Sequence, residues 1–363
     1  MKEKHLEHEE AYHGKDKKKY RKERKILSQK DRSKYKKTDL EKQKKATIKK
    51  EDFKRGRVLA ILADGILVDF DDTLYTCSLR GALKKETLRI KNLVAVGDFV
   101  FFKPEKNQVG SIRHIEDRHS ILSRAEQISR QKEQLIAVNI DQVLITASVG
   151  IPPLKPTLID RYIIASLKGN MDPIIVINKI DLLDEYPKEQ ALFEEVKEIY
   201  SSLDIPLFPV STITKEGLDA LEQHMEGKSS VFSGQSGAGK TSLINAIIGS
   251  SYLTGEVITK TKKGAHTTST TRLLPIKGEG FCIDTPGIKS FGLWDIKKEE
   301  VQQYFFEIAA TAKECKFPDC SHLHEPNCAV KLALEEGKIS HLRFDSYCAL
   351  ITLKQRDRDY GCH

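Results

Sequence analysis

The hydrophobic positions in the first third of this 363-residue chain follow the pattern of short β-strands. Residues 57–62 and 66–70 are aliphatic and β-branched runs separated by an Asp-Gly pair, which is a hairpin signal. Together with three further runs, bounded by Asp, Gly, Asn and Pro, they predict a small barrel, and an OB-type fold is the leading candidate. The three further runs are 73–79, 98–103 and 110–115.

A second pattern occupies the middle of the chain. After a polar connector at 118–136, the apolar run 135–145 predicts a buried strand, residues 156–169 have helical spacing, and residues 174–177 are apolar without interruption. Short apolar runs that alternate with helices are typical of a mostly parallel sheet with helices on both faces. We therefore predict a multidomain α/β chain.

The charge of the chain is concentrated at its N-terminus. The net charge is +8, but residues 1–50 contain 20 of the 60 Lys and Arg residues and only 9 of the 52 Asp and Glu residues. Few aliphatic residues accompany these charges, so we expect disorder or a fluctuating helix. This tail is either a solvated low-complexity segment or an arm that binds a polyphosphate surface such as RNA.

The predicted barrel also has a basic feature. The connection 80–91, between its third and fourth strands, contains Arg80, Lys84, Lys85, Arg89 and Lys91. A basic loop on an OB barrel favours RNA binding, and the alternative is a spacer barrel with an ordinary solvated face. There is no run of about 18 apolar residues and no apolar signal-peptide core, so we expect no membrane partner. The cysteines number seven, and three of them fall within fourteen positions, a pattern typical of a reducing compartment, so we expect a cytoplasmic protein.

A glycine-rich motif between an apolar strand pattern and an apolar helix pattern predicts a phosphate-binding loop. It reads G-x-x-x-x-G-K-T from Gly234 to Thr241. Glycines let successive backbone N–H groups surround a phosphate, and the following helix N-terminus adds further donors. Lys240 is predicted to reach the β- and γ-phosphates, and the Thr241 hydroxyl to ligate Mg²⁺. The residues expected to hold the nucleotide phosphates are Gly234, Gln235, Ser236, Gly237, Ala238, Gly239, Lys240, Thr241 and Ser242.

Asn178-Lys179-x-Asp181 follows the apolar run 174–177 and resembles the guanine-specifying motif of P-loop GTPases. In that family the Asp accepts hydrogen bonds from the guanine N1–H and exocyclic amine. The Asn holds the loop and the purine O6, and the aliphatic stem of the Lys stacks on the base. Farther along, Ser211 and Thr212 resemble the second base-side loop, where a backbone N–H contacts the purine O6. The predicted ligand is therefore GTP or GDP.

Two further segments resemble the switches of the same family. Asp284-Thr285-Pro286-Gly287 resembles the D-x-P-G switch, in which Asp284 would hold Mg²⁺ through water and the Gly287 N–H would sense the γ-phosphate. The segment 264–270 resembles the first switch, where Thr267 or Thr268 would complete the Mg²⁺ shell.

The order of these motifs is unusual. Ordinary GTPases place the phosphate-binding loop first and N-K-x-D fourth, whereas here N-K-x-D precedes the phosphate-binding loop, as in a circularly permuted domain. Many GTPases also carry a Gln after D-x-P-G to orient the attacking water, but this chain has Ile288. Hydrolysis then needs a polar group from elsewhere, either His266 or a group of the partner. Gly237 occupies the position of the Asn that some permuted GTPases use with K⁺, which argues against K⁺ activation.

Three of the seven cysteines and a histidine form the pattern C-x4-C-x-H-x5-C. Cys315, Cys320, His322 and Cys328 would complete a closed tetrahedral shell, which indicates one structural Zn²⁺ rather than a catalytic one. Spacing alone leaves His324 as a competing fourth ligand. Beyond this pattern, helices are predicted at 328–335 and 339–353.

Taken together, these motifs resemble the RsgA (YjeQ) family of circularly permuted GTPases over roughly residues 56–353. The resemblance rests on the barrel, the motif order, G-x-H-T-T, D-T-P-G-I and the Cys/His pattern, and it agrees with His322 as the fourth zinc ligand. It implies a monomer that hydrolyses GTP when stimulated by the small (30S) ribosomal subunit, binds its rRNA and acts late in the maturation of that subunit. The catalytic residues would be Lys240, His266, Thr268, Asp284 and Gly287. The alternative is a GTP-binding RNA scaffold without a hydrolysis cycle.

The expected domains follow from these patterns. A basic tail (1–55) precedes the OB barrel (56–125), the permuted GTPase domain (126–294) and a zinc-binding, helical C-terminal domain (295–363).

Overall fold

The computed structural model describes residues 53–79, 93–125, 133–250, 271–284 and 298–359. The chain divides into two compact units, Met1–Phe53 and Lys54–His363, and all helices and strands in these ranges belong to the second unit. The basic tail (1–50) and the basic connection (80–91) lie outside the described residues.

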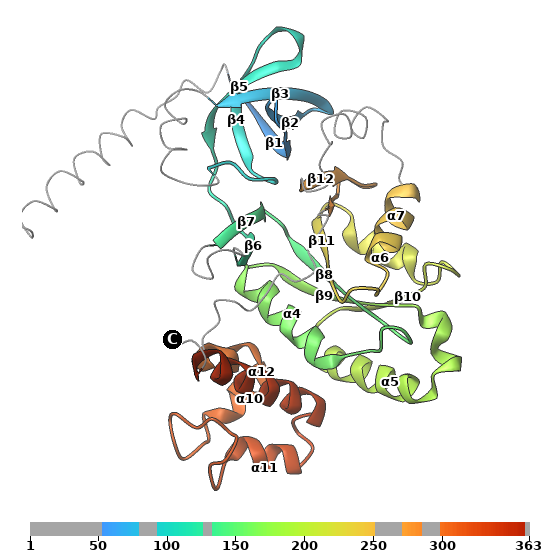
Figure 1. The fold of residues 1–363 in the computed structure, drawn as a ribbon, viewed down its shortest axis with the longest axis vertical. Coiled ribbons are helices and arrows are strands. Elements are labelled where there is room, and N and C mark those ends of the chain that lie inside the picture. Colours follow the sequence, from blue (N-terminus) through green and yellow to red (C-terminus); the bar gives the residue numbers. More distant parts are fainter. Residues whose placement is uncertain (1–52, 80–92, 126–132, 251–270, 285–297, 360–363) are drawn as a thin grey trace, which may run out of the picture. The chain divides into compact units, whose positions relative to one another are not determined.

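Five strands at the start of the second unit form a closed barrel (Figure 1). β1 pairs with both β2 and β4, so the strand order β1-β2-β3-β5-β4 returns to its beginning. Alternate side chains point inwards, and Val58, Val100 and Phe102 are fully buried in the barrel core. The predicted OB-type barrel is therefore confirmed. Its strands are β1 (Lys54–Ile61), β2 (Ile66–Phe70), β3 (Thr73–Leu79), β4 (Phe99–Pro104) and β5 (Val109–Ile115), with the 3-10 turn η2 (Lys106–Gln108) before β5.

Six further strands form a sheet in the order β10-β9-β8-β11-β13-β12, in which all neighbours are parallel except β13 and β12. The strands are β8 (Gln142–Ser148), β9 (Asp172–Asn178), β10 (Leu207–Val210), β11 (Ser229–Gly234), β12 (Arg272–Pro275) and β13 (Phe281–Asp284). β12 also pairs with β1 of the barrel, where Ala60 lies opposite Arg272.

Helices cover both faces of this sheet, as the apolar runs predict. Val143 and Ile145 of β8 pack in one core cluster with residues of α4 and α5, whereas Leu144 packs in a second cluster with residues of α6 and α7. The helices are α4 (Pro156–Lys168), α5 (Pro187–Ser202), α6 (Leu218–Met225) and α7 (Lys240–Ser250), and the 3-10 turn η3 (Ile180–Glu185) precedes α5.

The structure corrects the interpretation of 118–136 as a polar connector. β6 (Ile121–Ala125) and β7 (Glu133–Val138) pair in an antiparallel two-stranded sheet. The apolar run 135–145 is also divided, because Asn139 has a left-handed backbone (φ 55°) that ends β7 before β8 begins. The Asn139 side chain stabilises this turn by accepting a hydrogen bond from His119 N (3.0 Å) and donating one to Gly97 O (3.1 Å).

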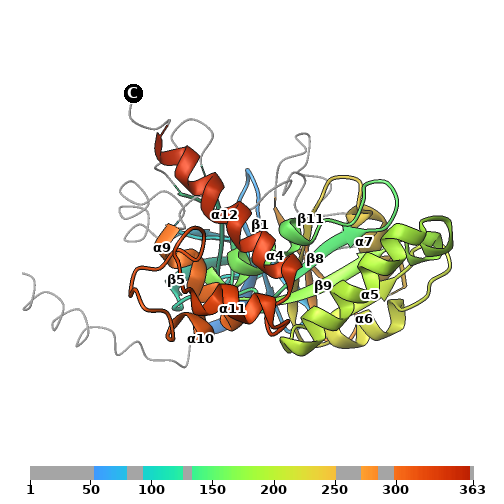
Figure 2. The same cartoon turned by 90° about the horizontal axis from the view of Figure 1, so that it is seen from below.

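The C-terminal segment is helical, and Figure 2 shows its last helix beside α4. Tyr347, Leu350 and Ile351 of α12 are buried in the same core cluster as Ile159 and Ile163 of α4. The elements are α9 (Lys298–Val301), the 3-10 turn η4 (Gln302–Tyr304), α10 (Phe306–Ala312), α11 (Ala329–Glu335) and α12 (His341–Asp359). Among the described residues, no helix combines the length and the apolar character needed to cross a membrane.

Candidate nucleotide and metal sites

The glycine-rich motif forms a loop between β11 and α7. Gly234, Gly237 and Gly239 have φ values of 144°, 82° and 91°, a backbone that residues with a Cβ rarely adopt. A Cβ at Gly239 would collide with Nδ2 of Asn178, so this glycine also allows two loops to approach each other closely. A backbone of this kind, which the glycines permit, is what a phosphate-binding loop requires.

Lys240 lies at the first position of α7 and folds back over the loop. Its ammonium donates to Gly234 O (2.9 Å) and Gln235 O (2.7 Å), and burial lowers its pKa. The side chains of Ser236, Thr241 and Ser242 are exposed around it. A cation and two hydroxyl groups of α7 therefore lie at a helix N-terminus, which suits a phosphate and its Mg²⁺.

The N-K-x-D segment lies at the end of β9 and contacts this loop directly. The buried Asn178 donates from Nδ2 to Ala238 O (3.0 Å), which ties the two segments together. Asn178 Oδ1 and Asp181 Oδ1 are buried acceptors with no hydrogen-bond partner among the described residues. Buried acceptors of this kind are costly unless a ligand supplies donors, and a guanine base does so with its N1–H and exocyclic amine.

The predicted second base-side loop, at Ser211 and Thr212, is a hydrogen-bonded turn that follows β10. Ser211 is fully buried, and its Oγ accepts from Ile213 N (3.2 Å) and Thr214 N (3.1 Å). The Ser211 N–H donates to Glu216 O (3.0 Å), so it is already used within the turn. Of the two N–H groups that the sequence offered to the purine O6, this leaves Thr212 as the better candidate.

The switch residues are only partly described. Asp284 is the last residue of β13, which is the parallel neighbour of β11, so its backbone lies at the same sheet edge as the glycine-rich loop. His266, Thr267, Thr268, Gly287 and Ile288 lie outside the described residues.

The predicted metal ligands lie together in the C-terminal segment. The ligand atoms of Cys315, Cys320, His322 and Cys328 are all within 4.8 Å of one another. The sulfur of Cys328 is 3.8 Å from those of Cys315 and Cys320. This agrees with the edge of about 3.8 Å expected for a tetrahedron with Zn–S bonds of about 2.3 Å. His324 is exposed, so the geometry favours His322 as the fourth ligand.

The histidine of this cluster is oriented by a residue that the sequence did not reveal. His322 Nδ1 faces the sulfurs (3.3 Å to Cys328 Sγ), and Nε2 is 3.2 Å from Oε1 of Gln302 in η4. If Nδ1 binds a metal, Nε2 carries the ring proton and donates a hydrogen bond to Oε1 of Gln302. Burial raises the pKa of the Cys320 thiol to about 12, and a bound cation would favour its ionised form. The four residues fit Zn²⁺, which would cross-link the segment without taking part in a reaction.

Comparison with known proteins identifies the family. The family model described as RsgA GTPase matches residues 115–294. A protein of Bacteroides fragilis named "Small ribosomal subunit biogenesis GTPase RsgA" is 37% identical over 291 residues, which are 79% of this chain and 93% of that protein. The chain belongs to the RsgA GTPase family. A protein of the same name from Chlorobaculum parvum is 40% identical over 269 residues, or 72% of this chain and 85% of that protein.

Solved structures extend the likeness to the fold. The crystal structure of YjeQ from Thermotoga maritima matches with a TM-score of 0.68 and 31% identity, covering 84% of this chain and 99% of YjeQ. YloQ, described as a circularly permuted GTPase, matches with a TM-score of 0.66 and 27% identity, covering 84% of this chain and 96% of YloQ. The permuted motif order is therefore confirmed as a family architecture.

As an RsgA-family GTPase, the chain is a GTP-hydrolysing enzyme that uses GTP, GDP and Mg²⁺. This agrees with the enzyme prediction and not with the scaffold alternative, in which hydrolysis plays no part. Within the described residues, the structure brings N-K-x-D, the glycine-rich loop and the end of β13 to one edge of the sheet.

Proposed function

We propose that this enzyme hydrolyses GTP on the small (30S) ribosomal subunit, which stimulates it, and that it acts in the cytoplasm as a monomeric, late-stage maturation factor. The observation that carries the proposal is the 37% identity to a small-subunit biogenesis GTPase over 93% of its length. The unpartnered acceptor of Asp181, beside a phosphate cradle, supports guanine as the base.

The proposed roles in binding follow from the site. Asp181 accepts from the guanine N1–H and amine, and Lys179 stacks its stem on the base. Asn178 holds the glycine-rich loop through Ala238 O, which keeps the base pocket and the phosphate cradle in register. Thr241 and Asp284 hold Mg²⁺, which stabilises negative charge on the phosphates when it is bound.

The proposed catalytic roles divide between the chain and its partner. When the nucleotide binds, the Lys240 ammonium gives up its hydrogen bonds to the carbonyls of Gly234 and Gln235 and donates to β- and γ-phosphate oxygens instead. Gly287 senses the γ-phosphate, and Thr267 or Thr268 completes the Mg²⁺ shell. Because Ile288 cannot hydrogen-bond water, His266 or a group of the ribosomal subunit orients the nucleophile.

We further propose that the barrel, the basic tail and the zinc segment contact rRNA. The tail carries 20 Lys and Arg residues in its 50 positions, and neutralising phosphates with such residues releases counterions and strengthens binding at low salt. Zn²⁺ is the structural metal of the Cys315 cluster.

A binding experiment tests this function. We expect the protein to co-sediment with small subunits in the presence of a non-hydrolysable GTP analogue and less with GDP, and not to co-sediment with large subunits. Lys240→Ala should lose the dependence on the nucleotide, whereas Lys197→Ala, a change of an exposed lysine on α5, should behave as wild type. Equal sedimentation with both subunits would contradict the proposal.

A further inference from the structure

The loop between β8 and α4, residues 149–155, connects the two halves of the nucleotide site. Its first residue, Val149, donates from N to Asn178 O (3.1 Å). The Lys179 ammonium donates to the carbonyl of Ile151. On its other side, Pro152 Cδ lies 3.3 Å from the point where a Cβ on Gly237 would be. The loop is therefore hydrogen-bonded to the N-K-x-D segment and lies beside the glycine-rich loop.

One carboxylate of helix α5 fixes this loop. Glu189 Oε2 accepts hydrogen bonds from Gly150 N (3.0 Å) and Leu154 N (3.2 Å), so a single oxygen closes the loop across four residues. Gly150 and Leu154 are both buried. Gly150 has a φ of 80°, and a Cβ there would lie 3.1 Å from the ring of Tyr186. The conformation of the loop thus depends on Glu189 and on the packing of α5.

Buried N–H groups explain why the carboxylate matters. If the Glu189 carboxylate were removed, the N–H groups of Gly150 and Leu154, both on buried residues, would lose their hydrogen-bond acceptor, which is unfavourable. The loop would relieve this cost by moving towards water. Leu154 is anchored in the main core cluster, so the movement would be concentrated in residues 150–153, which include the carbonyl that holds Lys179.

We propose that Glu189 is a positioning residue for guanine-nucleotide binding: through the loop 149–155 it places the Ile151 carbonyl, which holds the Lys179 ammonium so that the lysine stem lies along the base pocket. The proposal rests on the guanine site proposed above. Glu189 itself does not touch the nucleotide. It acts by selecting one position of Lys179, so its loss weakens nucleotide binding more than it slows the chemical step.

The first test compares three variants of α5 in the full-length protein. We expect Glu189→Ala to weaken the binding of fluorescent GDP and of a fluorescent GTP analogue by about tenfold. Glu189→Gln keeps an acceptor oxygen and should restore affinity to within about threefold of wild type. Glu198→Ala, a change of an exposed residue on the same helix, serves as the matched control. Wild-type affinity in Glu189→Ala overturns the proposal, as does equal impairment in Glu189→Gln.

A double-mutant cycle separates positioning from general destabilisation. Lys179→Met keeps the apolar stem and removes the ammonium that Ile151 holds. If Glu189 acts through Lys179, Glu189→Ala should weaken binding much less in the Lys179→Met background than in the wild type. Additive losses would mean that Glu189 only supports the fold, which contradicts the proposal.

A third test, on Asp181, distinguishes this inference from the guanine site on which it rests. Asp181→Asn should weaken GDP binding and shift preference towards xanthosine diphosphate, whose O2 accepts a hydrogen bond from the new amide. If Asp181→Asn leaves GDP binding unchanged, the guanine site is wrong. If Asp181→Asn weakens GDP binding and Glu189→Ala does not, only the role of Glu189 is wrong.

Discussion

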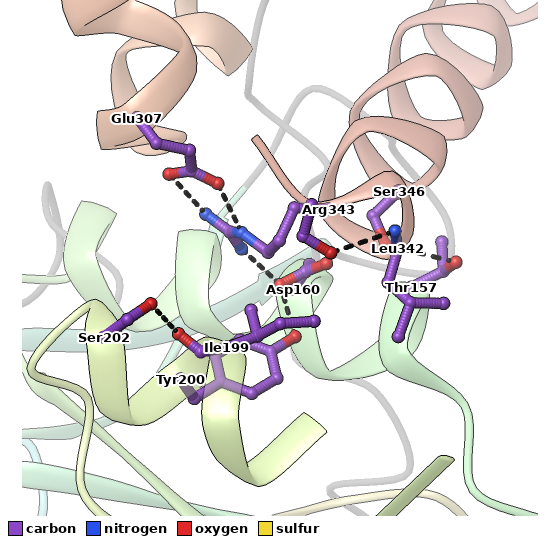
Figure 3. Close-up of polar contacts among 10 residues, drawn as sticks. Thr157, Asp160, Ile199, Tyr200, Ser202, Glu307, Leu342, Arg343 and Ser346 are labelled. Carbon is purple, nitrogen blue, oxygen red and sulfur yellow. Dashed lines mark hydrogen bonds and ion pairs between the residues drawn. The ribbon is translucent and has the colours of Figure 1, made fainter. Parts of the chain in front are cut away.

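Arg343 of α12 donates a hydrogen bond to Asp160 of α4, and the two side chains, 183 positions apart in sequence, are only 3% and 0% exposed (Figure 3). The Glu307 carboxylate of α10 accepts hydrogen bonds from Nε (2.7 Å) and Nη2 (3.2 Å) of the same guanidinium. The Tyr200 hydroxyl donates a hydrogen bond to Asp160 (2.6 Å). Burial raises the pKa of Asp160. This network ties the C-terminal segment to α4 and α5.

Removing the central cation should strongly destabilise the protein. Arg343→Met leaves Asp160 and Glu307 without their counter-charge, and breaking a buried ion pair from one side typically costs about 3–5 kcal/mol. Urea unfolding measures the change in the free energy of unfolding. Lys197→Met, which removes an exposed pair with Glu194, should change it by less than about 1 kcal/mol. A loss as small in Arg343→Met as in this control would show that the network is not an anchor.

The orienting hydrogen bond of the metal cluster gives a second prediction. Gln302→Ala removes the acceptor for His322 Nε2 and should weaken zinc affinity by about 10–100-fold, as the loss of such outer partners does. Competition with a chromogenic chelator measures this affinity, and one zinc per wild-type chain is expected by elemental analysis. The exposed neighbour provides the control, since Gln303→Ala should bind zinc as wild type does. Equal affinities for both variants would refute the role of Gln302.

Alanine substitutions at two glycines with positive φ distinguish the effect of backbone strain from the effect of the close approach between the glycine-rich loop and Asn178. Gly239→Ala introduces a Cβ that collides with Asn178 Nδ2, and should weaken GDP binding by at least about tenfold. Gly227 also has a positive φ (68°, against 91° for Gly239), but a Cβ added there would meet no atom within 4 Å. Gly227→Ala should reduce stability by about 1 kcal/mol and leave affinity unchanged. Fluorescent GDP titration of both variants is the measurement, and equal affinities would mean that the approach of the two loops is unimportant.

The local features of this fold follow from short stretches of sequence. The apolar runs 57–62 and 66–70 with their Asp-Gly turn, the glycines around Lys240 and the spacing from Cys315 to Cys328 are each set by the chemistry of neighbouring residues. Such patterns predict strands, a phosphate loop and a metal cluster without knowledge of the rest of the chain. The barrel, the sheet with helices on both faces and the cluster were therefore predictable.

The long-range features were not predictable in this way. Arg343 and Asp160 each lie on a helix where a charged residue would ordinarily face water, and only the packing of α12 on α4 buries them. Glu189 looks like any acidic residue in the first turn of a helix, and its partners are backbone groups that leave no mark in the sequence. The hairpin of β6 and β7 was missed because its polar residues resemble a linker.

The measurement that tests the central claim most directly is GTP turnover by the purified protein with and without small ribosomal subunits, with large subunits and ATP as controls. A GTPase without its activator turns over at roughly 10⁻⁴–10⁻³ per second, and we expect a basal rate no higher than this. The account predicts that the turnover rate rises by about tenfold or more when small subunits are added. This rise should occur with GTP, and neither large subunits nor ATP should produce it. A rate that small subunits leave unchanged would contradict it.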